Sequence, residues 1–153
     1  MAILQTSYGS NPAPLPPGSI INGETSNRIT RTCEDANGIA FGKAVFRGAL
    51  SSGVTASVGD GTGFLGIAIA TSSQSAWLDG TADAYERYQS VPILAEGVIH
   101  VETSAAVAKG DPAYSTPDGA LTNAGGDNFL LTGATFDSNG TGVVALRLSQ
   151  VGE

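Results

Sequence analysis

The sequence has very few of the residues from which metal centres and catalytic sites are usually built. Its 153 residues include one cysteine, Cys33, and one histidine, His100. A single cysteine excludes an intrachain disulfide and a thiolate metal cluster within one chain, which fits folding in a reducing cytoplasm. A lone histidine would leave a metal only carboxylates or ligands shared between subunits. We therefore assign no metal and no cofactor.

Charge is also scarce, and positive charge most of all. Charged residues make up 14% of the chain, and the formal net charge is −7. The seven Lys and Arg residues are spread singly along the sequence. Phosphate backbones and anionic membrane surfaces both require a basic stripe or patch on the protein. The sequence therefore predicts no nucleic-acid partner and no membrane partner.

Long apolar runs are missing. The opening residues Met1–Gln5 have neither the basic region nor the apolar stretch of a secretory signal. The nearest apolar run, residues 64–70, is broken by Gly66 and is far shorter than the ~20 residues that cross a bilayer. We expect a protein that is neither exported nor inserted in a membrane.

Glycine, by contrast, is abundant, with 21 copies. Gly is poorer than Ala inside a helix by ~1 kcal/mol, so this composition disfavours helices. Asn-Gly and Asp-Gly pairs suit two-residue turns between twisted strands, because both positions tolerate positive φ. Such pairs occur at residues 22–23, 37–38, 60–61, 79–80, 118–119 and 139–140. They predict the ends of short strands.

The segments between these turns have the length and content of strands. They cover residues 39–46, 64–70, 88–95, 98–103, 128–132 and 142–148. Only residues 72–86 and 104–108 contain enough Ala for a helical turn or two. We predict an all-β fold, a single compact β-barrel or jelly-roll-like sandwich.

An extended N-terminal arm precedes this body. Four of the seven prolines lie between Pro12 and Pro17, and each restricts its own φ and the residue before it to extended conformations. We assign residues 1–24 to the arm and 25–153 to the body. Ordering such an arm costs backbone entropy, so it must find a partner surface or remain a loose tail.

The apolar residues of the arm and the aromatic residues of one loop segment are the predicted protein interface. Aromatic side chains on loops often anchor interfaces, although Trp77 could equally plug one end of the barrel. The predicted contacts with a partner protein or a neighbouring subunit are Ile3, Leu4, Tyr8, Leu15, Pro16, Pro17, Ile20, Ile21, Trp77, Tyr85 and Tyr88.

No pattern in the chain predicts catalysis. Residues 61–66 match the G-x-G-x-x-G pattern, but a strand follows where nucleotide binding requires a helix. His100 lies in a predicted strand, and the chain has no G-x-S-x-G nucleophile elbow. We expect Cys33 to be buried, and we expect Glu34 and Asp35 to be solvated. We assign no catalytic residue.

Two early segments resemble the opening of phage capsid cement proteins. These are residues 17–21 and Cys33–Val45, which contains the pattern Gly-Ile-x-Phe-Gly at residues 38–42. The later elements of that family follow in order at residues 64–68, 91–94, 97–101 and 107–114. The similarity covers about residues 17–148.

This resemblance implies a β body outside the phage shell, with the arm or loops gripping the major capsid protein. It also implies a small homo-oligomer, a dimer or a trimer, without catalytic residues. The protein would be made in the host cytoplasm and end on the capsid exterior. Two alternatives are a head fibre or receptor-binding module that recognises glycans, and a small hydrolase that depends on His100.

Overall fold

The computed structural model describes residues 14–21, 23–59, 62–71 and 83–149. These residues form eleven strands and no helix, which confirms the all-β prediction. No helix in them could cross a membrane. The strands are β1 (Asn27–Cys33), β2 (Ile39–Ala40), β3 (Ala44–Arg47), β4 (Gly53–Thr55), β5 (Thr62–Ala68), β6 (Ala84–Tyr85), β7 (Ser90–Val107), β8 (Pro112–Ser115), β9 (Leu121–Thr122), β10 (Phe129–Phe136) and β11 (Gly140–Leu148).

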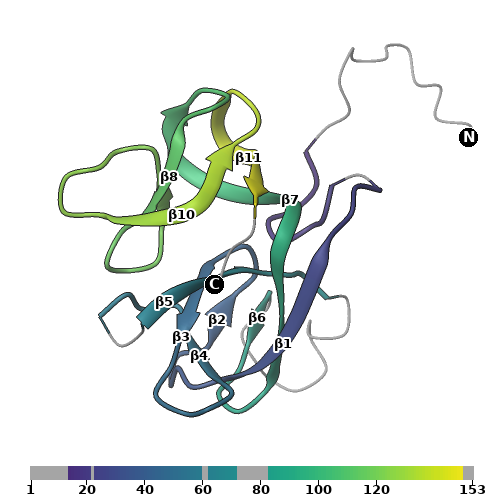
Figure 1. Ribbon diagram of the computed structural model, residues 1–153, viewed down its shortest axis with the longest axis vertical. Helices are drawn as coiled ribbons and strands as arrows, with labels where there is room; N and C mark the ends of the chain where they lie inside the picture. Colours follow the sequence, from purple (N-terminus) through teal and green to yellow (C-terminus); the bar gives the residue numbers. More distant parts are fainter. Residues whose placement is uncertain (1–13, 22, 60–61, 72–82, 150–153) are drawn as a thin grey trace, which may run out of the picture.

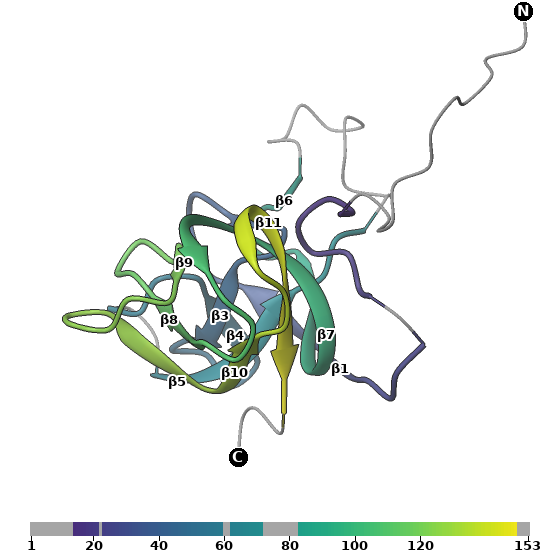
Figure 2. The ribbon, with the colours of Figure 1, turned by 90° about the horizontal axis from the view of Figure 1, so that it is seen from above.

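Nine of these strands form one sheet that closes on itself twice. In the first ring, β1, β4, β3, β5 and the first half of β7 are closed by antiparallel pairing of β1 with β7. In the second ring, β11, β10, β8 and β9 join the second half of β7, closed by Thr103 beside Leu121. The two rings lie one above the other (Figures 1 and 2). The predicted barrel is confirmed, as a closed sheet whose two rings share one strand.

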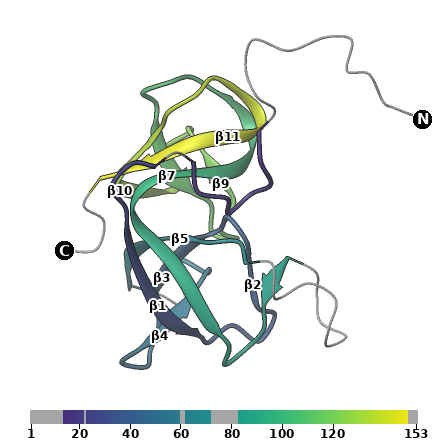
Figure 3. The same cartoon turned by 90° about the vertical axis from the view of Figure 1, so that its right-hand side faces the viewer.

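The shared strand β7 is 18 residues long and bends between the rings (Figure 3). Val91 and Ile93 belong to one buried cluster, whereas Ile99 and Val101 belong to the other. Gly97 lies between them with φ +130°, a conformation that favours glycine, and the register of β1 shifts opposite residues 94–96, just before Gly97. One strand can therefore serve two cores because it turns at Gly97.

The second cluster joins the rings. It contains the interior of the second ring and also Phe46 and Phe64, from strands of the first ring. The rings of Phe46 and Phe64 lie 5.8 Å apart between centroids, and Phe129 of β10 meets Phe46 edge-on at 5.5 Å. Such aromatic pairs add to the free energy gained by burying their area. The two rings thus pack as one unit.

The described turns and strands agree with most of the sequence prediction. Gly38, Gly119 and Gly140 have positive φ at three of the predicted turns. Residues 104–108 have an Ala content that would allow a helical turn, but residues 104–107 continue β7 instead. Hydrogen-bonded pairing across the second ring outweighs the local preference of Ala for a helix. Residues 72–82 lie outside the described residues.

Candidate functional site

The last part of the predicted arm is bound to the body. We call residues 18–21 the arm base. The Gly18 N–H donates to the His100 carbonyl at 2.8 Å, the His100 N–H donates to the Ser19 carbonyl at 2.9 Å, and the Ile21 N–H donates to the Val98 carbonyl at 2.9 Å. The other edge of β7 at His100 pairs with β11. The arm base therefore pairs with β7 through an isolated antiparallel bridge close to the bend of that strand, which Figure 3 shows.

Two glycines allow this close approach. Gly18 has φ +86°, and its carbonyl accepts a hydrogen bond from the Ala70 N–H at 2.8 Å. A Cβ at Gly18 would lie 2.7 Å from the Ala70 nitrogen, and one at Gly42 would lie 2.8 Å from the Pro17 Cβ. No larger residue fits either position without a shift of backbone. The arm therefore starts from a defined point and direction.

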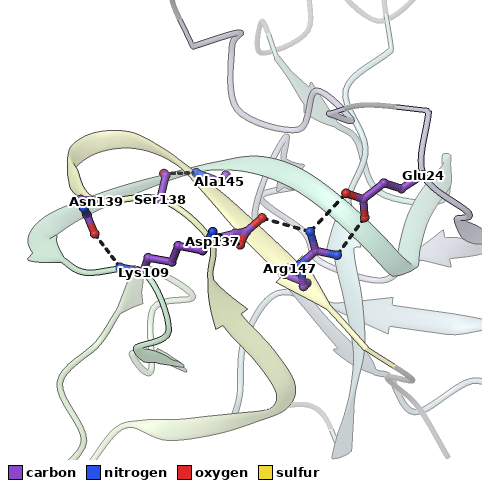
Figure 4. A network of polar contacts seen from close by, with 7 residues as sticks. All are labelled: Glu24, Lys109, Asp137, Ser138, Asn139, Ala145 and Arg147. Atoms are coloured by element: carbon purple, nitrogen blue, oxygen red, sulfur yellow. Dashed lines mark hydrogen bonds and ion pairs between the residues drawn. The ribbon is translucent and has the colours of Figure 1, made fainter. Parts of the chain in front are cut away.

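A charged network holds the chain just after the arm base (Figure 4). The Arg147 guanidinium donates to both Glu24 carboxylate oxygens, at 2.8 and 3.2 Å, and to Asp137 at 3.1 Å. Lys109 lies 3.7 Å from the other Asp137 oxygen. The hydrogen bonds to Glu24, and then those to Asp137, raise the pKa of Arg147 above its ordinary value. Because the network is exposed, it contributes about 1 kcal/mol or less, but its two-pronged geometry orients the chain.

A groove of about 800 Å³ opens beside the arm base. Pro16 and Pro17 line it, together with Glu102 of the second ring. Thr71 and Asp83, the described residues on either side of segment 72–82, also line it. Residues 72–82 themselves lie outside the described residues. The described end of the arm at Pro16 and Pro17 and the two residues that flank segment 72–82 therefore line the same groove.

The predicted interface residues fall into four groups. Leu15, Pro16 and Tyr88 are exposed, and Leu15 exposes 52% of its surface. Ile21 of the arm base and Pro17 just before the arm base are half-buried. Four of the predicted contacts lie outside the described residues: Ile3, Leu4, Tyr8 and Trp77.

Two of the predicted contacts serve the body instead. Ile20 forms a bridge with Ile99 and packs against the core that joins the rings. Tyr85 is buried, its ring lies 5.1 Å from that of Phe41, and its hydroxyl donates to the Ile69 carbonyl. Each side chain is already covered by its own chain, so we leave both out of the proposed interface.

The two carboxylates that the sequence predicts to be solvated are structural. Glu34 accepts hydrogen bonds from the amides of residues 49–50 at 2.9 and 2.7 Å. Asp35 accepts from the Thr55 hydroxyl at 2.5 Å and from the Ala56 amide at 2.8 Å. Turns leave backbone donors without partners, and these side chains supply the acceptors. The prediction is wrong in part, because both side chains are only half-buried but also hold loops.

The other candidate chemical groups are parts of the scaffold. Cys33 is buried as predicted, and burial raises the pKa of its thiol, which makes it a poor nucleophile. Residues 62–66 of the glycine-rich pattern belong to β5. Within the described ranges, no three His, Cys, Asp or Glu side chains gather as a metal site would require.

His100 is half-buried beneath the arm base. Its Nδ1 is buried and has no hydrogen-bond partner among the described residues, and burial lowers the pKa of its imidazole. The unfolded chain therefore takes up a proton at higher pH than the folded chain. Stability from this group is complete above about pH 6.5 and falls as the pH drops below it.

We accordingly expect acid to destabilise the wild type more than a His100→Asn protein. Thermal unfolding should be followed from pH 7.5 to 5 for both proteins. The carboxylates are the same in the two, so their titration cancels from the difference in Tm. A difference that stays constant over this range would contradict the prediction.

Comparisons with known proteins agree with the fold and identify the family. A model of the structural cement protein family (E217 gp24/Pam3 gp6) matches residues 4–149. A solved chain from the capsid of Myoviridae phage XM1 is similar over 99% of both chains, with a TM-score of 0.72 and 20% identity. No curated protein matches the chain. Because the family model spans nearly the whole sequence, the chain belongs to the phage structural cement protein family.

Proposed function

We propose that this protein binds the outside of an assembled phage head and stabilises it by bridging subunits of the major capsid protein. The observation that carries the proposal is the anchored arm base. Residues 18–21 are hydrogen-bonded to β7, while residues 14–16 just before them are exposed. Family membership supports a structural role in the virion. A proline-rich arm that leaves the body from a fixed point suits attachment to another protein.

The energetics favour attachment to an assembled shell over attachment to free subunits. A ligand that binds only one state of a receptor stabilises that state by mass action. The proline-rich residues and the fixed arm base reduce the entropy lost when the arm binds. Contacts to two neighbouring subunits multiply modest single affinities through a high effective concentration. A composite site across a subunit junction therefore exists only in the completed head.

Charge and assembly fit the same role. A net charge of −7 keeps copies of the free protein apart before they meet a head. We also propose that the protein forms a small homo-oligomer, a dimer or a trimer, which places several arms on one junction. The protein would act on the capsid exterior after synthesis in the host cytoplasm. Mass measurement on the purified protein tests the oligomer.

The glycan-binding alternative finds less support. Carbohydrate grooves need exposed aromatic faces on which sugars stack. Among the described residues that line the groove, Phe41 is the only aromatic one, and its ring packs against Tyr85. Head attachment therefore remains the function we propose.

The test mixes purified protein with undecorated heads of its own phage. We expect saturable binding, regular extra density outside the shell by electron microscopy, and a higher temperature of head disruption. Free major capsid protein should bind much more weakly than heads. Heads that stay bare, or decorated heads that break at the same temperature as bare ones, would contradict the proposal.

A further inference from the structure

The turn before β7 contains a strained tyrosine. Among the described residues, every positive φ belongs to a glycine except those of Asp83 and Tyr88, at +61° and +70°. Asp tolerates this region through local hydrogen bonds, but a bulky aromatic residue pays a cost on the order of 1–2 kcal/mol. Most positions with positive φ in this chain are occupied by glycine, whereas this position is occupied by tyrosine. A side chain kept against the backbone preference points to a role for that side chain.

The turn is rigid. The Gln89 N–H donates to the Glu86 carbonyl at 3.1 Å, and the Glu86 N–H donates to the Gln89 side chain at 2.9 Å. The Tyr88 N–H donates to the Cys33 carbonyl at 2.8 Å, and the Cys33 N–H donates to the Gln89 carbonyl at 2.9 Å. These bonds fix the turn to the end of β1. The Tyr88 side chain is therefore presented from a defined position.

The side chain at this position faces solvent. Tyr88 exposes 67% of its surface, the largest fraction among the exposed large apolar residues described. The guanidinium carbon of Arg87 lies 4.8 Å from the centre of its ring, a cation–π distance. None of the described carboxylates forms an ion pair with Arg87. We call Arg87 and Tyr88 the tip.

The tip lies well away from the arm. The tip lies one residue before Ser90, where β7 begins, and the arm base meets β7 at His100. Ten residues of strand correspond to roughly 30 Å of chain. Tyr and Arg are also the residue types that most often dominate protein interfaces. The two ends of this half of β7 thus carry two separate candidate attachments.

We propose that the tip is a second attachment point, at which Tyr88 enters an apolar recess on a capsid protein and Arg87 pairs with an acidic group at its rim. This rests on the proposed function and adds the chemistry of a second contact to it. Because Arg87 is positively charged, its partner group on the capsid protein should be acidic. Because the Tyr88 ring is exposed and largely apolar, the recess that receives it should be apolar. Attachment at two points on one rigid strand lets one copy span two capsid subunits.

Tyr88→Gly tests the tip, because glycine prefers the backbone that tyrosine strains. We expect its Tm to be equal to or above that of the wild type, and its affinity for undecorated heads to be at least tenfold lower. Arg87→Gln should also lower the affinity, and the remaining binding should depend less on salt. Leu50→Ala is the matched control, since Leu50 is exposed on another turn. That control should bind as the wild type does.

The outcomes separate the two proposals. If the wild type decorates heads and Tyr88→Gly decorates them equally well, the tip is not an attachment point, whereas head binding itself stands. If the wild type leaves heads bare, the proposed function and the tip fail together. A Tyr88→Gly protein that unfolds at a much lower temperature would show that the ring serves the fold, and that would also overturn the inference.

Discussion

A protein that lacks residues 1–13 should keep its fold and lose most of its affinity for undecorated heads. The truncated chain retains the arm base with its hydrogen bonds to His100 and Val98, so we expect its Tm to change by no more than a few degrees. It loses Ile3, Leu4 and Tyr8. Burial of such side chains contributes about 1.5–3 kcal/mol each before the entropy of ordering the arm is subtracted. A net loss of roughly 3 kcal/mol corresponds to about a hundredfold weaker binding.

Binding to heads should be measured by co-sedimentation over a range of free protein concentrations. The cut after residue 13 is better than a cut after Pro17, because Pro17 packs beside Gly42. A full-length protein with Ser at positions 3, 4 and 8 is the matched control, and its affinity should fall nearly as far. Full occupancy of heads by the truncated protein, at the concentration at which the wild type saturates them, would contradict the role of the arm.

The sequence predicts the parts of this fold that depend on local chemistry. Asn37-Gly38 and Asp118-Gly119 form turns, because their backbone preferences do not depend on distant contacts. Apolar runs between the turns become strands, because their residue types suit a pleated, half-buried surface. No local pattern predicts β1, since its sequence NRITRTC has little apolar content and it becomes a strand by closing the first ring against β7. Whether a closed sheet has one ring or two is likewise decided by pairings between distant segments.

The candidate functional site, like the fold, can be predicted from the sequence only where it depends on local chemistry. Prolines indicate the arm, but nothing in the sequence indicates that residues 18–21 pair with residues 98–100. The pair of Glu24 and Arg147 joins residues 123 positions apart, and opposite charge alone does not identify such partners. Tyr85 and Tyr88 are three residues apart, and one is buried while the other is exposed. The difference depends on the Ile69 carbonyl, which the fold brings to the Tyr85 hydroxyl.

The direction in which the arm leaves the body should matter for head binding, as well as the presence of the arm. The Gly18→Val protein tests the direction alone, because it keeps every other residue of the arm. Valine at φ +86° is strained by about 1–2 kcal/mol, and its Cβ would press on the Ala70 backbone. Release of the hydrogen bonds between Gly18 and the body costs about 1 kcal/mol more for each bond. We expect the free energy of unfolding to fall by roughly 3 kcal/mol. Chemical denaturation measures this change.

Gly110→Val is the matched control, because Gly110 has φ +94° and a Cβ at this position would meet no described atom within 4 Å. The free energy of unfolding of Gly110→Val should fall only by the cost of the backbone strain, and this protein should bind heads normally. Gly18→Val keeps every residue of the arm, yet the arm would leave the body from a loosened base. Its affinity should therefore lie between those of the wild type and the truncated protein. If it bound heads as tightly as the wild type, the arm would act as a flexible tether, and the ordered arm base would serve only the stability of the body.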